Sequence, residues 1–485
     1  MMHTPFFPSL RARLAALGKR TAQSLRQLDF PPLAQNLRQL LPAAVLASSE
    51  QGPNSRERIY CLRLSFECFV WQMLKPRTSC REVVRAVQAL FKSQGRGPVD
   101  GGSAGYIQAR QRLPRQHLEQ ALEATATSAD QRVDGQGQLN GRAVKVVDCS
   151  TTQLPDTAAN QKSYPQPSSQ KPGCGFPLMK FLVLFRLGSG AIGHVLMDQW
   201  NKHDLRLWNR AWKYLSPGDI ALGDRAFADY ATRASLPQQQ VDVVARLSRT
   251  RRVDFRRGHQ RLGRHDALFE LRKGRQQSDI LSSEPWEKLP EKIIVRIIRF
   301  EAFIRGCKRR VTLVTTLLDP VAYPAQKLIA LYARRWNLEL ALRHVKTTMA
   351  MEQLRCHTPD MAQKEVLAYL IAYNLIRCLM AQAVAQAGVQ MERVSFKGTV
   401  DAVRQYTSAM SAAPNKRKRQ QLWDHLVSNI VVDLVPLRPG RREPRAVKRR
   451  PKHYPLLNKP RHHYKETPHR SRYRKSKTTK NQGLI

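Results

Sequence analysis

One helix in the second half of the chain limits what this sequence can fold into. Residues 328–355 have helical spacing and carry Tyr332, Arg335, Glu339 and Lys346 at offsets of 0, 3, 7 and 14, with Arg343 just beside them. At about 100° per residue, the first four side chains fall within an arc of about 60° and project from one face. One acid among bases and a phenol is unsuited to an apolar core. A solvated face held by ion pairs is the ordinary explanation, and a phosphate-binding metal site is the alternative.

The charge of the whole chain favours a polyanionic partner. There are 82 Lys and Arg residues against 37 Asp and Glu, a formal net charge of +45. Such an excess repels itself unless it is neutralised, and nucleic acid is the expected partner. A membrane surface is the weaker alternative, and no run of 18 apolar residues predicts a spanning helix. The eight cysteines form no C-x-x-C pair and no zinc-like cluster, so we expect reduced thiols in a cytoplasmic protein.

The first and last parts of the chain differ from its middle. The spacing in residues 58–92 and 103–125 predicts helices, with a capping box formed by Ser79 and Glu82 and a break at Pro114. A small helical domain with exposed Arg and Gln suits recognition of DNA ends, and a bundle with no DNA role fits equally well. Residues 438–480 hold 17 Lys and Arg against two acids, which predicts a flexible arm that neutralises phosphates.

The middle of the chain alternates strand and helix patterns. Apolar runs predict strands in this order: 142–148, 180–187, 192–197, 220–224 and 241–248. The second and third flank Gly188-Ser189-Gly190, which predicts a hairpin. With the helical patterns between and after them, these strands predict a mixed α/β layer. Residues 249–311 are rich in Arg and then β-like, which predicts an insertion whose last strand, 311–318, rejoins the sheet.

Three acids are placed where a metal site would need them. Asp148 and Asp224 each end a short apolar strand, and Glu339 lies on the helix after the insertion. If the first and fourth strands are neighbours, the two aspartates meet at one sheet edge and the helix brings Glu339 over them. Carboxylates are the hard ligands that Mg²⁺ prefers, and a two-metal site can cleave a phosphodiester. Taken singly, Asp148 is explained equally by a turn cap and Asp224 by a helix N-cap.

Three segments resemble the signature blocks of bacterial DDE transposases of the insertion sequence 4 family: VVDCSTT, LGDRAF and YARRWNLELALRHVK. The family's last block, Y-x2-R-x3-E-x6-K, is matched by Tyr332, Arg335, Glu339 and Lys346 without a spacing error. The second block is matched from Asp224 through Arg225 to Phe227. The first usually has Gly after the Asp, where this chain has Cys149. The resemblance covers residues 144–384 and, more loosely, both flanks.

The resemblance implies an α/β fold with an RNase H-like catalytic core, a β-rich insertion, an N-terminal helical domain and a basic C-terminal arm. The corresponding expected segments are 1–137 (helical, DNA-binding), 138–248 (first part of the core), 249–311 (insertion), 312–400 (second part of the core) and 401–485 (helix and arm). It also implies cut-and-paste transposition of an insertion sequence, with hydrolysis at the element ends followed by strand transfer into target DNA.

The implied site assigns roles to individual residues. Asp148, Asp224 and Glu339 would bind two Mg²⁺ ions, with Mn²⁺ as a substitute. The phosphates near the cleavage point would be held by Tyr332, Arg335 and Lys346, with Arg225 and Arg343 as second candidates. Trp286, the single Trp of the insertion, is the candidate for stacking on a flipped base if a hairpin forms, and a packing role is its plainer explanation.

The expected partners are double-stranded DNA, namely the terminal inverted repeats and the target, and a second copy of the chain in the synaptic complex. We expect no membrane partner and a cytoplasmic, nucleoid-associated location in a bacterium. Other classes are a catalytically inactive DNA-binding relative and another RNase H-like nuclease such as a junction resolvase. A basic RNA-associated protein fits less well, because no RNA-binding aromatic motif is visible.

Overall fold

The computed structural model describes residues 59–436, except 94, 134, 249–250, 275–280, 305–306 and 412, and then residues 457–464. The predictions for residues 1–58 and for most of the basic arm therefore lie outside the described residues. The cysteines among the described residues are free, as expected of reduced thiols.

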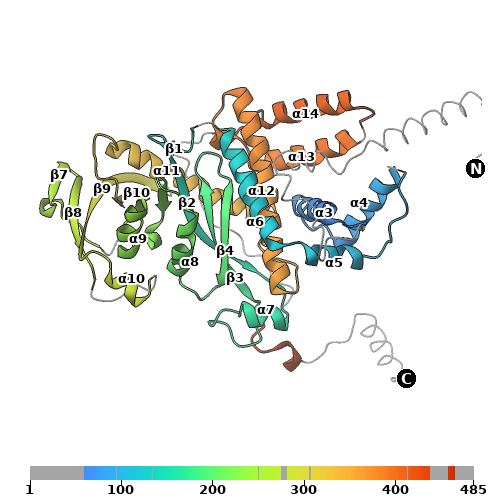
Figure 1. Ribbon diagram of the computed structural model, residues 1–485, viewed down its shortest axis with the longest axis horizontal. Helices are drawn as coiled ribbons and strands as arrows, with labels where there is room; N and C mark the ends of the chain where they lie inside the picture. Colours follow the sequence, from blue (N-terminus) through green and yellow to red (C-terminus); the bar gives the residue numbers. More distant parts are fainter. Residues whose placement is uncertain are drawn as a thin grey trace, which may run out of the picture.

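A large mixed sheet runs through the molecule (Figure 1). Its strands are β1 (Gln138–Leu139), β2 (Arg142–Gln153), β3 (Leu178–Arg186), β4 (Ile192–Gln199), β5 (Ile220–Gly223), β6 (Asp242–Arg246), β7 (Gln260–Gly263), β8 (Asp266–Arg272), β9 (Lys292–Ile304) and β10 (Cys307–Thr315). Their order is β4-β3-β2-β5-β6-β10-β9-β8-β7, with β1 paired to β2. The pairs β2–β5 and β5–β6 are parallel, while the other pairs are antiparallel. The first and fourth predicted strands, β2 and β5, are therefore neighbours, as expected.

β2 is longer than the sequence indicated. Its antiparallel pairing with β3 runs from Lys145 to Gln153, whereas its parallel pairing with β5 stops at Val146. The prediction that Asp148 ends the strand or caps a turn is wrong, because β3 continues to satisfy the backbone beyond it. Asp148 instead lies inside β2, just past the point where β5 ends.

Helices cover both faces of the β2–β6 part of the sheet. Alternate strand residues point to opposite faces, so Val146 and Val147 enter different cores. One face packs against α6 (Arg115–Gln131), α11 (Ala325–Arg343) and α12 (Pro359–Ala387). The other packs against α8 (Asp204–Ala211) and α9 (Tyr230–Ser235). The result is a mixed sheet flanked by helices, the mixed α/β arrangement that the alternating patterns predicted.

α12 is the central helix of the larger core. Within the described residues it alone is long and apolar enough to cross a membrane by length and composition, although acids and bases interrupt its apolar run. Most of it is buried inside the protein, as in the core helix of a globular fold. The buried Asn374 side chain accepts from Ile192 N at 2.9 Å and donates to Leu122 O at 3.1 Å, which ties α12 to β4 and α6. These bonds satisfy a polar group that would otherwise be costly to bury.

Two groups of smaller helices lie beside α12, at the end of the molecule away from β7 and β8 (Figure 1). α3 (Leu62–Leu74), α4 (Cys80–Ser93) and α5 (Ala104–Arg112) precede α6, while α13 (Phe396–Ser411) and α14 (Lys416–Ile430) follow α12. The predicted capping box at the start of α4 is confirmed, because Ser79 N donates to Glu82 Oε2 at 3.0 Å and Glu82 N donates to Ser79 Oγ at 3.2 Å. The predicted break at Pro114 is confirmed between α5 and α6. Two short helices, α7 (Ala158–Ser163) and α10 (Ser283–Glu287), lie in connections.

Candidate active site

The helix that carries Glu339 ends earlier than predicted. α11 stops at Arg343 and continues as one π-helical turn, His344–Thr348, so the expected helix to Arg355 is wrong. Beyond it the chain joins the end of β2, where Thr152 Oγ1 donates to Met351 O at 2.6 Å and Leu354 N donates to Gln153 O at 2.9 Å. These bonds compete successfully with helix propagation.

The π turn decides where Lys346 lies. Its ammonium group donates to Ser150 Oγ at 3.2 Å, so it is held against β2, two residues from Asp148. A straight α-helix over the same residues would carry Lys346 along the helix face instead. Ser150 is a site residue that sequence reasoning did not single out, although it lies within the VVDCSTT segment.

Asp224 lies immediately after β5, at the start of a 3₁₀ turn formed by Arg225–Phe227. Its Oδ1 accepts a hydrogen bond from Ala226 N at 2.7 Å, so this acid both ends a strand and caps a turn. Gly223 makes the turn possible, because a Cβ there would lie 2.9 Å from Phe227 Cβ and 3.2 Å from Val147 Cγ1. A larger residue would push Phe227 outward and move Asp224 with it.

Asp148 feels the other two acids. Burial raises its pKa to about 6, against the opposing effects of Arg335 and of the Cys149 N–H, which donates to Asp148 Oδ1 at 2.9 Å. The negative charges of Asp224 and Glu339 also raise this pKa. The fold therefore brings all three predicted acids into one electrostatic cluster around Asp148.

Arg335 is the cation within this cluster. It is only 6% exposed, and its Nη2 donates to Glu339 Oε1 at 2.9 Å. Its guanidinium lies 5.7 Å from the centre of the Tyr332 ring, which is itself buried. Burial lowers the pKa of Arg335, but Tyr332, Asp148 and Glu339 together raise it more. The Arg335 Nε–H is buried without a partner among the described residues, so the guanidinium keeps an unused donor.

The donor set suits a divalent cation, although the side chains are not gathered around one. Across the described residues no three side chains of His, Cys, Asp and Glu come close enough to hold a metal ion. The Glu339 carboxylate is instead paired with Arg335 at 2.9 Å. The two carboxylates Asp224 and Glu339 raise the pKa of the third, Asp148, and all three side chains are hard oxygen donors of the kind that divalent cations prefer. The carboxylates of Asp148, Asp224 and Glu339 therefore have the chemistry that a divalent metal ion requires.

The other predicted site residues are placed less closely. Arg225 and Arg343 are exposed, on the 3₁₀ turn after β5 and at the end of α11. Trp286 lies on α10 and is 8% exposed, with its ring 6.2 Å from that of Tyr230 and 5.8 Å from Lys273 Nζ. Its position in the core beside Leu289 matches the packing role. A base could stack on it only after α10 had moved.

Comparisons with known proteins point in one direction. The family described as "Transposase DDE domain" matches residues 140–375, which include the three acids. Transposase InsG for insertion sequence element IS4 of Escherichia coli (strain K12) is 24% identical over 412 residues, covering 83% of this chain and 89% of that protein. A solved synaptic complex of the piggyBac transposase with hairpin DNA overlaps with a TM-score of 0.38 and 12% identity, covering 84% of each chain. An overlap this loose supports no residue-level comparison.

Proposed function

The chain belongs to the DDE transposases of the insertion sequence 4 family, and we propose that it moves its element by cut-and-paste transposition. The family generally uses divalent metal ions and acts on DNA. In the proposed reaction, hydrolysis at the element ends frees a 3′-hydroxyl, which then attacks target DNA. The single observation that carries the proposal is the coupling of Asp148, Asp224 and Glu339 across two parallel strands and one helix.

We propose that the β4-β3-β2-β5-β6 part of the sheet is an RNase H-like core. Three strands joined by hairpin pairings, followed by two parallel strands beside the first, support this assignment. In this fold the β7–β10 segment is the insertion between Asp224 and Glu339. Its last strand, β10, pairs antiparallel with β6, which is consistent with an insertion that extends the core sheet.

Asp148, Asp224 and Glu339 would hold the divalent ions, two Mg²⁺ in our proposal. When bound, such ions supply an activated nucleophile and stabilise the leaving oxygen of the phosphodiester. Asp148 must be ionised to serve as a ligand, and Arg335 favours that form by lowering its pKa against burial. The Cys149 N–H orients one Asp148 oxygen, and the Ala226 N–H orients one Asp224 oxygen.

The cations beside the acids would hold the scissile phosphate. Lys346 is fixed against Ser150 on the same strand as Asp148, and it provides a point charge. The Arg335 guanidinium keeps an N–H donor, at Nε, that has no partner among the described residues. The planar arrangement of guanidinium donors matches phosphate oxygens. Charges that are already positioned need not reorganise during the reaction, which is how fixed groups lower a barrier.

The remaining parts of the proposal concern assembly and location. Synapsis of two element ends requires two active sites, so we propose a homodimer on DNA. The helices α3–α6 would bind the terminal repeats, and the basic arm would add contacts independent of sequence. We place the protein in the cytoplasm, on the nucleoid.

The direct test is Glu339→Gln, with Glu352→Gln as the matched control. Glu352 is an exposed acid just beyond the π turn, and its side chain is outside the cluster. Losing one ligand removes several kcal/mol of transition-state stabilisation, so Glu339→Gln should reduce Mg²⁺-dependent cleavage of element ends about a thousandfold. Binding to the same DNA should remain. A Glu339→Gln protein that still cuts would show that the metal-site assignment is wrong.

Products distinguish the proposal from its alternatives. Wild-type protein should join cleaved ends to a second duplex, which a nuclease of the same fold would not do. An inactive DNA-binding relative would bind element ends without cutting them. Gel analysis of cleaved and joined strands reads all three outcomes from one reaction.

A further inference from the structure

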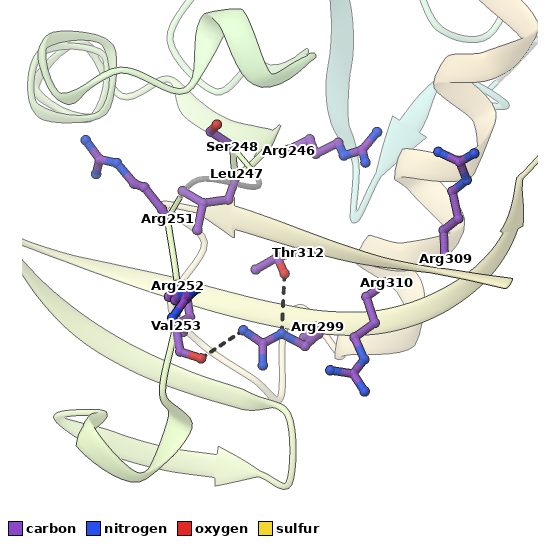
Figure 2. A pocket seen from close by; sticks show the side chains of 10 residues that line it. All are labelled: Arg246, Leu247, Ser248, Arg251, Arg252, Val253, Arg299, Arg309, Arg310 and Thr312. Atoms are coloured by element: carbon purple, nitrogen blue, oxygen red, sulfur yellow. Dashed lines mark hydrogen bonds between the residues drawn. The ribbon is translucent and has the colours of Figure 1, made fainter.

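A basic site, separate from the carboxylate cluster, lies on the part of the sheet that joins the core to β9 and β10. A cavity of about 700 Å³ opens where the end of β6 and the chain after it face these two strands (Figure 2). Six of the ten residues that line it are arginines: Arg246, Arg251, Arg252, Arg299, Arg309 and Arg310. Its lining contains no acid and no aromatic ring.

Strand pairing builds this arginine pocket from distant parts of the chain. β10 pairs with β6 at Leu313 and Arg246, and with β9 at Thr312 and Arg299. Arg299 fixes the loop against the strands, because its Nη2 donates to Val253 O at 2.9 Å and its Nε donates to Thr312 Oγ1 at 3.4 Å (Figure 2). One arginine is therefore structural and holds the frame that carries the others.

Positive charge exceeds negative charge around the other arginines of the pocket. Among the described residues none of them forms an ion pair: Arg246, Arg251, Arg252, Arg309 and Arg310. Two acids lie close to the pocket: Asp254 is paired with Arg256 at 3.2 Å and Arg257 at 3.9 Å, and Glu301 lies opposite Arg310 in the pairing of β9 with β10. The excess charge is felt by a buried neighbour, since burial and then the charge of Arg251 lower the pKa of Arg233 to about 10. Such a cluster costs stability unless an anion neutralises it.

We propose that the arginine pocket binds the sugar–phosphate backbone of one DNA strand, contacting several successive phosphates without reading the bases. Guanidinium forks match phosphate oxygens bidentately. The side chains are spread around the cavity, with Arg251 at one end and Arg309 and Arg310 at the other, where these two point to opposite sides of β10 (Figure 2). This spread suits a chain of phosphates better than a single anion. Base recognition on single strands uses aromatic stacking platforms, and no aromatic side chain lines the pocket.

The pocket continues toward the active site through Arg246. This residue follows Val244 at the alternate position of β6, and Val244 packs in the core that contains α11. Its charge lowers the pKa of the buried Tyr332 phenol, against the larger opposing effect of burial, so the two side chains are electrostatic neighbours. A strand lying in the pocket is thus led to the Tyr332–Arg335 side of the carboxylates. This inference rests on the proposed function, because it assigns a path to the DNA that is cut.

The experiment measures DNA affinity against salt for the full chain, in EDTA so that no cleavage occurs. The test variant is Arg309→Ala with Arg310→Ala, and the probes are short duplexes of element-end and unrelated sequence. Each lost phosphate contact reduces the slope of log K against log salt by about 0.9, so the double variant should lower it by one to two. Affinity should fall about tenfold, and equally for both probes.

The matched control is Arg256→Ala with Arg257→Ala. These two arginines lie on the same segment but outside the pocket, with side chains 89% and 88% exposed and paired to Asp254. Their loss should leave the salt slope unchanged. A second variant, Arg309→Lys with Arg310→Lys, keeps the charge and should restore the slope, which separates charge loss from misfolding.

Each outcome of the salt-dependence experiment either supports or overturns the proposed DNA-binding role of the arginine pocket. An unchanged slope in the Arg309 and Arg310 alanine variant, or an equal change in the control, would overturn the pocket. A loss confined to the element-end probe would also overturn it, because the pocket would then read sequence. Failure of the proposed function is seen separately, as absence of cleavage and joining by wild-type protein when Mg²⁺ is added, whatever the salt slopes show.

Discussion

The carboxylate cluster and the arginine pocket occupy neighbouring parts of one sheet and treat charge in opposite ways. In the cluster, a buried arginine is placed among three acids, and the pKa of Asp148 still stands at about 6. In the pocket, six arginines line one cavity and no acid is among the lining residues. In the first region the acids outnumber the cations beside them, and in the second the arginines outnumber the acids. In our proposal, divalent ions would balance the charge of the first region and the DNA backbone that of the second.

Among the variants that follow, the largest effect should come from disturbing the geometry of the acids without changing their charge. In Gly223→Ala the new Cβ would lie 2.9 Å from Phe227 Cβ, so the turn that carries Asp224 must shift. Displacements of about 1 Å can cost about a hundredfold in rate, and we expect a loss of that size in cleavage. Overpacking should also cost about 1–3 kcal/mol of unfolding free energy. Single-turnover cleavage and denaturant unfolding measure the two effects.

Gly193→Ala is the control for this prediction. A Cβ at Gly193 would meet neighbours only at 3.8 Å and beyond, which is ordinary contact. This variant should keep both its stability and its cleavage rate. If Gly223→Ala and Gly193→Ala have the same cleavage rate and stability, the acid cluster tolerates displacement. The two regions would then not differ in how strictly they depend on geometry.

A smaller effect should separate the compensating arginine from its neighbour in sequence. Arg335→Ala leaves Asp148 and Glu339 without their cation, so we expect the free energy of unfolding to fall by about 1–2 kcal/mol. The loss should be smaller than for a fully buried pair because the Glu339 side chain is 46% exposed. Arg334→Ala removes a pair to Glu392 at 3.1 Å on the outer side of the same helix, and it should cost less than about 0.5 kcal/mol. Urea unfolding at neutral pH compares them, and equal losses would contradict the role given to Arg335.

The smallest predicted effect concerns His344, just past the end of α11, where burial and nearby positive charge both act on the imidazole. Burial, followed by the charges of Arg377 and Arg343, lowers the pKa of His344 to about 4. Between about pH 6.5 and 4 the unfolded chain binds a proton there that the folded chain does not, so this group reduces stability as pH falls through that window. His344→Phe keeps the stacking on Phe396, at 4.7 Å between ring centroids, and removes the loss.

The comparison for His344 is the difference in unfolding free energy between pH 7 and pH 5. The wild-type protein should lose about 1 kcal/mol more than His344→Phe over this interval, after allowance for partial solvent screening. An identical pH dependence in the two proteins would show that His344 titrates normally and that the positive field ends with α11.

Much of the site could be predicted because its signals are local. An apolar run that ends in an acid marks both Asp148 and Asp224, and the spacing on the helix marks Arg335 and Glu339. The strand order then followed, since β2 and β5 are neighbours. The errors lay where a distant segment took over the backbone: β3 extends β2 past Asp148, and the end of β2 draws residues 349–355 out of the helix.

The arginine pocket shows where prediction from sequence ends. Its arginine-rich segment was visible, but Arg246 and Arg310 lie more than 60 positions apart and become neighbours only through the pairing of β10 with β6. The role of Trp286 likewise depended on what packs beside it, which its sequence context of Pro285 and Glu287 does not state.

By itself the sequence determined the chemistry available to this protein: three hard acids in order, a phenol, a guanidinium and an ammonium at fixed spacing, and an excess of positive charge. These are properties of residue type and of short helices and strands, which local periodicity dictates. Only the tertiary structure decided that Arg335 lies inside the acid cluster, that Lys346 reaches Ser150, and that six arginines line one cavity. Long-range strand pairing and burial set those distances, and charge interactions depend on distance and burial rather than on sequence separation.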